Sequence, residues 1–269
     1  MVQIFMGIKS HIKHILEIFG NMWFLVVNMI LSVMILLVHR YGDKQMNKTV
    51  VDEYLVDLYL RLNGYITTGL IIHTPIWGQT STDIDKIAIK YPHHNQQDRQ
   101  VASSEFMVSS AAKIDVIFCE IKNQPDKLKF NRPIKTDPNV LISSLSWLGM
   151  IPPDEIDGLA QKLIVMFQDD TNSAIAKTGF SWGEYNFRAL LCCPNLHNDT
   201  FSWALNSGEI FSFISKCLNP HERRDTCSTR YNFNQWGYVT TDIVKYFKGN
   251  DEPNIDGLYD ELLKKFELE

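Results

Sequence analysis

The sequence predicts an α/β protein with a mixed central sheet. Short β-branched and apolar runs of strand length stand between segments that repeat apolar residues at helical spacing. With 269 residues, 45% of them hydrophobic, the chain is long enough to bury a substantial core. Helices separate the last predicted strand from the earlier ones, as in α/β domains. The predicted elements are helix 49–63, strands 64–72, 83–91 and 113–123, helices 138–148 and 153–163, and strand 187–194.

The first 47 residues are predicted to be a membrane anchor. Residues 22–38 carry no charge, and with residues 18–20 they approach the roughly 20 apolar residues that span a bilayer. A signal peptide would have a shorter apolar run followed by a small-residue cleavage site, and a buried core helix is rarely apolar on every face. We therefore expect a single transmembrane helix over about residues 20–39. The basic residues place the large domain in the cytoplasm, because two precede the span and three follow it: Lys9, Lys13, Arg40, Lys44 and Lys48.

Cysteine content and charge limit the compartment and the partner. The five cysteines are odd in number and two are adjacent, which indicates reduced thiols rather than a secreted disulfide framework. The formal net charge is −5, and the first 50 residues hold five basic and two acidic side chains, which leaves −8 on the remainder. An acidic domain has no overall attraction for phosphate, so a nucleic-acid partner would need a local basic groove.

The helix at 49–63 and the strand at 83–91 each place acids near their start. Asn63-Gly64 ends the helix, and Glu53 near its beginning either complements the helix dipole or reaches toward a site. After strand 64–72 and loop 73–82, Asp83 and Asp85 are two positions apart and so share one face of their strand. Such a pair at the start of a strand can also simply cap backbone N–H groups.

Strand 113–123 carries the strongest chemical signal. Glu120 and Lys122 are two positions apart, so they project side by side from the end of a largely apolar strand. Burying a charge is costly unless it is paired or binds a metal. The two residues are therefore either a structural ion pair or part of a catalytic site.

Taken together, Glu53, Asp83 or Asp85, and Glu120-Ile121-Lys122 resemble the PD-(D/E)xK nuclease superfamily, which has the restriction-endonuclease-like fold. The predicted order of elements across roughly residues 50–195 is similar to the αβββαβ core of that superfamily. The proline of the motif is absent before Asp83. The resemblance implies a Mg²⁺-dependent endonuclease or exonuclease that also accepts Mn²⁺, with DNA favoured over RNA as the substrate.

The resemblance also implies roles for individual residues. Asp85 and Glu120 would hold the metal, with the backbone carbonyl of Ile121 as a further ligand. Asp85 is favoured over Asp83 because it stands just before the apolar segment 87–89, and Asp83 would be a helper. The catalytic set would be completed by two further side chains: Lys122, which would position the attacking water, and Glu53, which would reach in from its helix.

The remaining segments carry weaker signals. The polar stretch 93–104 is longer than an ordinary hairpin loop and either clasps a substrate or is an exposed insertion. Residues 196–269 are expected to form a C-terminal helical extension packed on the core at 48–195, ending in an acidic amphipathic helix at 255–269. The densest basic cluster either meets phosphates or is a solvated loop, and it comprises Arg223, Arg224 and Arg230.

A zinc site is a further alternative that the sequence supports poorly. Cys192, Cys193, His197, Cys217, His221 and Cys227 could be drawn as its ligands. No pair among them has the CxxC spacing, and adjacent cysteines on a strand point to opposite faces. His93 and His94 have no further ligands spaced to join them.

The predicted membrane span, together with what the resemblance implies, predicts a membrane-anchored, metal-dependent nuclease. The alternative is a membrane-anchored binding or sensing protein that keeps the fold and lacks the chemistry, with Glu120 and Lys122 as a structural pair. In a third interpretation the membrane helix assembles several copies and so switches the nuclease, as would suit a bacterial defence effector. No residue argues specifically for this homo-oligomer.

Overall fold

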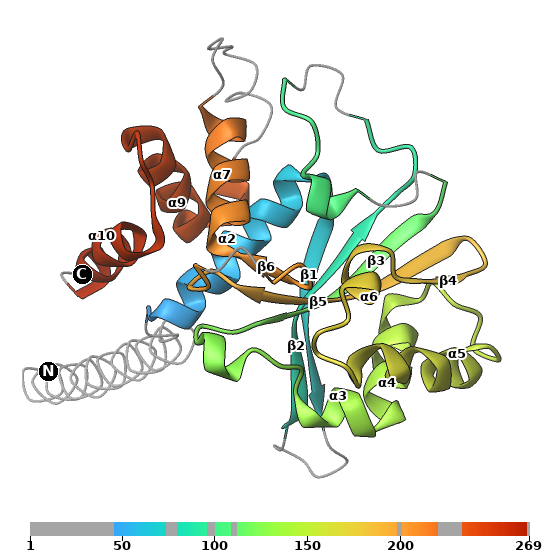
Figure 1. Ribbon diagram of the computed structural model, residues 1–269. Helices are drawn as coiled ribbons and strands as arrows, with labels where there is room; N and C mark the ends of the chain where they lie inside the picture. Colours follow the sequence, from blue (N-terminus) through green and yellow to red (C-terminus); the bar gives the residue numbers. More distant parts are fainter. Residues whose placement is uncertain are drawn as a thin grey trace, which may run out of the picture. The chain divides into compact units, whose positions relative to one another are not determined.

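A mixed β-sheet with helices on both faces organises the described part of the chain (Figure 1). The computed structural model describes residues 46–73, 80–95, 100–108, 112–197, 201–219 and 233–267. The predicted transmembrane helix and the three arginines of the basic cluster lie outside these residues. Among the described helices, none has the length and apolar character needed to cross a membrane. Contacts between residues group Met46–Glu269 as one compact unit, and this unit includes both the predicted core and the predicted C-terminal extension.

Six strands form the sheet in the described residues, in the order β1-β2-β3-β5-β4, with β6 also paired to β5. Neighbouring strands are antiparallel from β1 to β3 and between β5 and β4, whereas β5 runs parallel to both β3 and β6. This pattern confirms the predicted α/β fold with a mixed central sheet. The strands are β1 Ile66–His73, β2 Thr80–Lys90, β3 Ile114–Ile121, β4 Phe180–Trp182, β5 Tyr185–Cys193 and β6 Ala204–Asn206.

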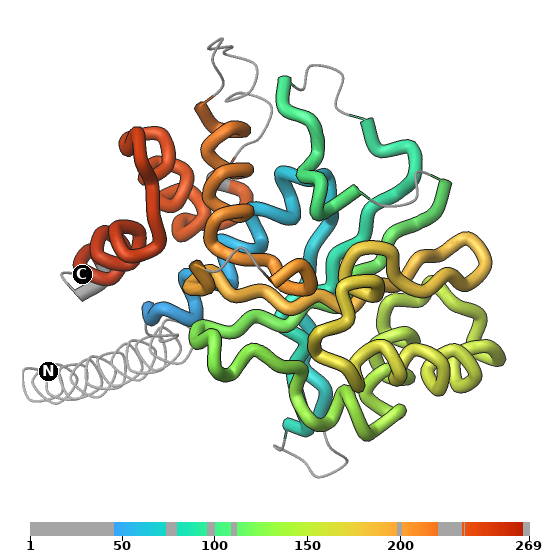
Figure 2. Tube along the Cα trace, in the orientation of Figure 1, coloured from blue at the N-terminus to red at the C-terminus, as the bar shows by residue number. Residues whose placement is uncertain are grey.

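Two helical layers cover the sheet, and their members come from distant parts of the sequence. One face carries α2 Lys48–Leu62 together with α7 Ser207–Leu218, α9 Tyr238–Gly249 and α10 Ile255–Glu267. Figure 2 shows the carboxyl-terminal helices beside the amino-terminal α2. The other face carries α3 Arg132–Thr136, α4 Pro138–Leu148 and α5 Ile156–Leu163. The short elements are α6 Ser173–Lys177 and the 3₁₀ turns η1 Glu105–Met107, η2 Pro125–Lys127, η3 Ile164–Phe167 and η4 Phe233–Trp236.

The central strand β3 is buried on both faces, which explains its nearly continuous apolar sequence. Ile117 and Cys119 pack into the core beneath α2, whereas Val116 and Phe118 pack into the core beneath α4 and α5. Because side chains alternate along a strand, Glu120 projects to the same face as Phe118. The strand therefore delivers a carboxylate to the edge of an apolar layer.

The predicted loop at 73–82 is too long, and two strands were not predicted. The β1–β2 ladder reaches as far as the pair His73 and Thr80, so part of the loop is strand. Backbone hydrogen bonding to a neighbouring strand extends these ends, although their polar composition is typical of a loop. The three-residue strands β4 and β6 are too short to show a periodicity of two.

A buried ion pair crosses the sheet at the other end of β3 from Glu120. Arg188 Nη2 of β5 lies 2.5 Å from Asp115 Oδ2, and neither side chain is exposed by more than 1%. Tyr65 Oη donates a hydrogen bond of 2.6 Å to Asp115 Oδ2 and accepts one of 2.7 Å from Arg188 Nη2. Asn186 Nδ2 donates to Asp115 Oδ1 at 3.0 Å. The charges are thus paired and hydrogen-bonded, as burial requires.

Replacing Tyr65 by phenylalanine is expected to destabilise the protein by about 2 kcal/mol, because both charged partners lose a hydrogen bond where water cannot replace it. Urea denaturation followed by circular dichroism measures this loss. Tyr91→Phe is the control, because Tyr91 is 53% exposed and its substitution should change stability by less than about 0.5 kcal/mol. Equal stabilities of the two variants would show that the Tyr65 hydroxyl contributes nothing.

Candidate functional site

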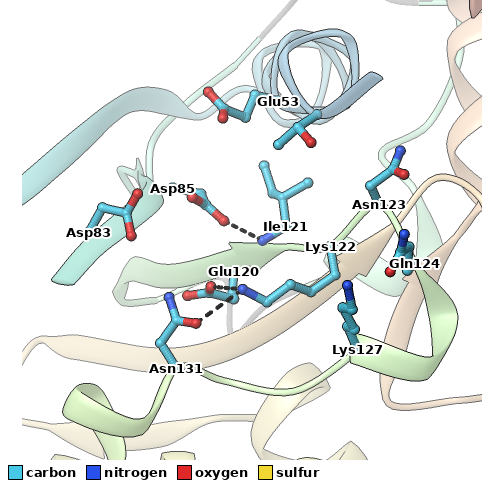
Figure 3. A pocket seen from close by; sticks show the side chains of 11 residues that line it. Glu53, Asp83, Asp85, Glu120, Ile121, Lys122, Asn123, Gln124, Lys127 and Asn131 are labelled. Carbon is cyan, nitrogen blue, oxygen red and sulfur yellow. Dashed lines mark hydrogen bonds and ion pairs between the residues drawn. The ribbon is translucent and has the colours of Figure 1, made fainter. Parts of the chain in front are cut away.

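The candidate site lies where β2 and β3 separate, at the carboxyl end of β3. The ladder between the two strands ends with the pair Lys86 and Cys119. Beyond it, Asp85 Oδ2 accepts a hydrogen bond of 2.6 Å from the backbone N–H of Ile121. A side-chain carboxylate thus takes the place of a ladder carbonyl. This bond holds Asp85 beside the end of β3, and a pocket of about 360 Å³ lies there (Figure 3).

The pocket brings together the five side chains that the sequence singled out. They come from α2, from β2, from β3 and from the residue that follows β3: Glu53, Asp83, Asp85, Glu120 and Lys122. Six further residues complete the lining, and sequence reasoning did not select them: Thr49, Ile121 as a side chain, Asn123, Gln124, Lys127 and Asn131. In Figure 3 the acidic side chains gather toward β2, and Asn123, Gln124 and Lys127 lie along the turn after β3.

The two central carboxylates are held in an environment that disfavours their charge. Burial raises the pKa of Glu120 from 4.5 to about 7, and repulsion from Asp85 adds to this rise, while Lys122 opposes it. Burial also raises the pKa of Asp85 from 3.8 to about 6, against the hydrogen bond from Ile121 and with repulsion from Asp83 and Glu53. Lys122 therefore compensates only part of the negative charge in the pocket, and a further cation would be favoured there.

Lys122 is held in place by two acceptors. Its ammonium group donates to Glu120 Oε1 and, at 3.1 Å, to Asn131 Oδ1 (Figure 3). Asn131 is the residue before α3, and its side chain caps no backbone N–H of that helix. It lies nine residues after Lys122, in a segment without a periodic pattern, so the sequence carried no signal for its part in the site.

The carboxylate oxygens of the pocket are the kind of ligand that a hard divalent cation prefers, but they would supply only part of its coordination. Within the residues that the structure describes, no three His, Cys, Asp or Glu side chains are grouped so as to hold a metal ion. The carboxylates of Asp85 and Glu120 line the same pocket and repel each other. The backbone N–H of Ile121 donates to Asp85 Oδ2, so the backbone of this residue lies beside the Asp85 carboxylate. Mg²⁺ commonly binds one or two carboxylates and keeps several waters or substrate phosphates as its other ligands.

The alternative zinc site finds no support among the cysteines that the structure describes. Cys192 lies in the core beneath α2, and Cys193 lies in the core on the opposite face of the sheet. Two thiols on opposite faces of one strand cannot share an ion. Cys192 Sγ instead lies 3.2 Å from Cys119 Sγ of the neighbouring strand, and both are buried and free. His221 and Cys227 lie outside the described residues.

Comparison of the chain with models of protein families, with curated proteins and with solved structures finds no match. The fold and the pocket therefore carry the functional argument. They define an α/β protein with a pocket at a strand end that is lined by four acidic side chains and two lysines.

Proposed function

We propose that this protein is a metal-dependent nuclease that hydrolyses phosphodiester bonds in the pocket at the end of β3. The observation that carries the proposal is the meeting of Asp85, Glu120 and Lys122 in one pocket, although they come from two strands and a turn. The order of α2, three antiparallel strands, helices and the parallel strand β5 supports a restriction-endonuclease-like core of the PD-(D/E)xK type over residues 48–195.

Asp85, Glu120 and the carbonyl of Ile121 would hold Mg²⁺, with Mn²⁺ as a substitute. When bound, the ion would supply Lewis-acid activation of water and would stabilise negative charge on the phosphate. The raised pKa values of the two carboxylates agree with this assignment, because an uncompensated buried pair gains from a nearby cation. Asp83 lies on the same wall of the pocket and would add to its negative potential.

The chain's own side chains would position the substrate and the attacking water. Lys122 is fixed by Glu120 and Asn131, so its ammonium group is already oriented before a substrate binds. A fixed cation of this kind stabilises charge that develops on a phosphate and needs little reorganisation. Lys127, on the turn after β3, offers a second cation in the pocket, and Glu53 approaches from α2 (Figure 3). These two lysines would provide the local positive charge that a nucleic-acid substrate needs on a domain whose net charge is negative.

Residues 1–47 would anchor the enzyme in a membrane with the large domain in the cytoplasm. The ion pair between Lys122 and Glu120 also suits the second candidate function, a binding or sensing protein with a purely structural pair. The two candidates differ in one property, because only the nuclease cleaves nucleic acid in a metal-dependent way.

The test is cleavage of supercoiled plasmid DNA and of structured RNA by the full-length chain purified in mild detergent. We expect cleavage with Mg²⁺ or Mn²⁺, none with a chelator, and faster cleavage of DNA than of RNA. Glu120→Gln purified in the same way controls for contaminating nucleases. Folded protein that cleaves neither substrate with either metal would refute the nuclease and favour the binding protein.

A further inference from the structure

A hydrogen-bond network joins the last helix to the turn that carries Lys122. Tyr259 of α10 donates from Oη to Asp52 Oδ1 of α2 at 2.5 Å. The same Oη accepts hydrogen bonds from Asn195 Nδ2 at 2.8 Å and from Asn123 Nδ2 at 3.1 Å. A tyrosine hydroxyl has one proton to donate and two lone pairs, so all of its capacity is used. Tyr259 and Asp52 are almost fully buried, at 2% and 0% exposure.

Asn123 is the member of this network that reaches the pocket. Its Nδ2 also donates to Asp52 Oδ2 at 2.7 Å, and its backbone carbonyl accepts from Asn195 Nδ2 at 2.8 Å. The preceding residue, Lys122, donates its backbone N–H to Cys192 O at 2.8 Å. The side chain and the backbone of Asn123, the residue directly after Lys122, are thus both hydrogen-bonded to the protein interior.

The network also holds two walls of the pocket, the start of α2 and the end of β3, in position relative to each other. Asp52 precedes Glu53 in α2, and Asn123 follows Lys122. One hydroxyl at Tyr259 therefore bridges the start of α2 to the end of β3. Since a displacement of about 1 Å can lower a rate by up to about 10²-fold, the bridge bears directly on how Lys122 is presented.

We propose that Tyr259 is a positioning residue of the active site and that it acts through Asn123 and Asp52 to orient Lys122 and Glu53. The inference rests on the proposed nuclease function. It makes α10, which the sequence predicts only as part of a packed extension, a component of the catalytic machinery. Tyr259 itself does not line the pocket, so it would influence the reaction only through the residues that it holds.

The decisive experiment compares Tyr259→Phe with Tyr246→Phe in the full-length protein. Tyr246 lies in α9, is 4% exposed, and its hydroxyl bonds only to Asn254 in the described part of the chain, donating to its carbonyl at 2.9 Å and accepting from its N–H at 3.1 Å. Both variants remove a buried hydroxyl from the C-terminal helices. We expect Tyr259→Phe to lower kcat about tenfold with KM changed less than about twofold, and Tyr246→Phe to keep kcat within about twofold at a similar loss of Tm.

Hydrogen exchange of residues 122–127, read by mass spectrometry, provides a readout without activity. We expect faster exchange of this turn in Tyr259→Phe and wild-type exchange in Tyr246→Phe. Unchanged exchange, or an equal fall of kcat in both variants, would overturn the positioning role. If the wild type cleaves no nucleic acid, the proposed function fails, and faster exchange in Tyr259→Phe alone would still establish that this residue holds the turn.

Discussion

Lys122→Ala is expected to lower the rate of phosphodiester cleavage by about 10²- to 10³-fold, which is typical for the loss of one oriented group that stabilises transition-state charge. The Lys122 ammonium group is held by Glu120 and Asn131 inside the pocket, whereas Lys127 lines the pocket from the turn after β3 and makes neither of these contacts (Figure 3). Single-turnover cleavage of an end-labelled DNA duplex in saturating Mg²⁺ measures the effect. Lys122→Arg keeps the charge but changes the geometry of the donors, and we expect partial activity.

The matched control for this prediction is Lys135→Ala. Lys135 Nζ lies 2.6 Å from Asp170 Oδ2, and its side chain is 21% exposed, close to the 22% of Lys122. It belongs to α3 and does not line the pocket. Both substitutions remove a lysine from a half-buried ion pair, so their effects on Tm should be similar. A cleavage rate that is equally low in the two variants, or unchanged in both, would contradict a catalytic role for Lys122.

The second large effect that we expect is a loss of stability with rising pH, which Mg²⁺ should reverse if it binds in the pocket. The pKa of Glu120 rises from 4.5 to about 7 on folding, so the folded state favours the protonated carboxyl. That contribution is fully present below pH 4.5 and is lost as pH rises through about 7. The change corresponds to roughly 3 kcal/mol. Burial also raises the pKa of Asp85, so its contribution to stability is likewise lost as the pH rises. Because the two carboxylates repel each other, their contributions to stability are not simply additive.

Glu120→Gln isolates this contribution, because other carboxyl groups also shape the pH dependence of the whole protein. In a chelator, the variant should gain stability relative to the wild type between pH 4.5 and pH 8 by up to roughly 3 kcal/mol in chemical denaturation. Mg²⁺ at pH 8 should stabilise the wild type by mass action and leave the variant nearly unaffected. Asp242→Asn removes a buried carboxylate that pairs with lysines outside the pocket, and this control should respond to Mg²⁺ like the wild type. A wild type that is indifferent to Mg²⁺ would argue against a metal site.

Local spacing was enough to predict much of the fold and the centre of the site. Apolar residues at helical spacing correctly predicted α2, α4 and most of α5, and the strand patterns predicted the positions of β1, β2, β3 and β5. Glu120 and Lys122 could be placed on one face because an alternation of two is a property of the strand alone. The two thiols at Cys192 and Cys193 could be separated by the same rule, and the structure confirms that they enter opposite cores.

Other members of the site belong to segments whose sequence carries no periodic signal. Lys127 lies in a short 3₁₀ turn and Asn131 follows that turn, and only the fold of the chain after β3 brings them to the pocket. The raised pKa values of Asp85 and Glu120 also depend on burial by elements distant in the sequence. Composition indicates which residues can titrate, whereas the free-energy cost of their charge depends on what surrounds them.

The sequence by itself determined several of the helices, the longer strands, the alternation of faces along β3, and the presence of an acid and a base at its end. Only the tertiary structure decided that Asp85 accepts a hydrogen bond from Ile121 and that Tyr259 holds a residue 136 positions before it. The physical reason is that a periodic pattern specifies which face of an element is apolar, and this is a local property. Which faces meet is decided by the packing of all elements together, and contacts between polar groups at the borders of those faces follow from that packing.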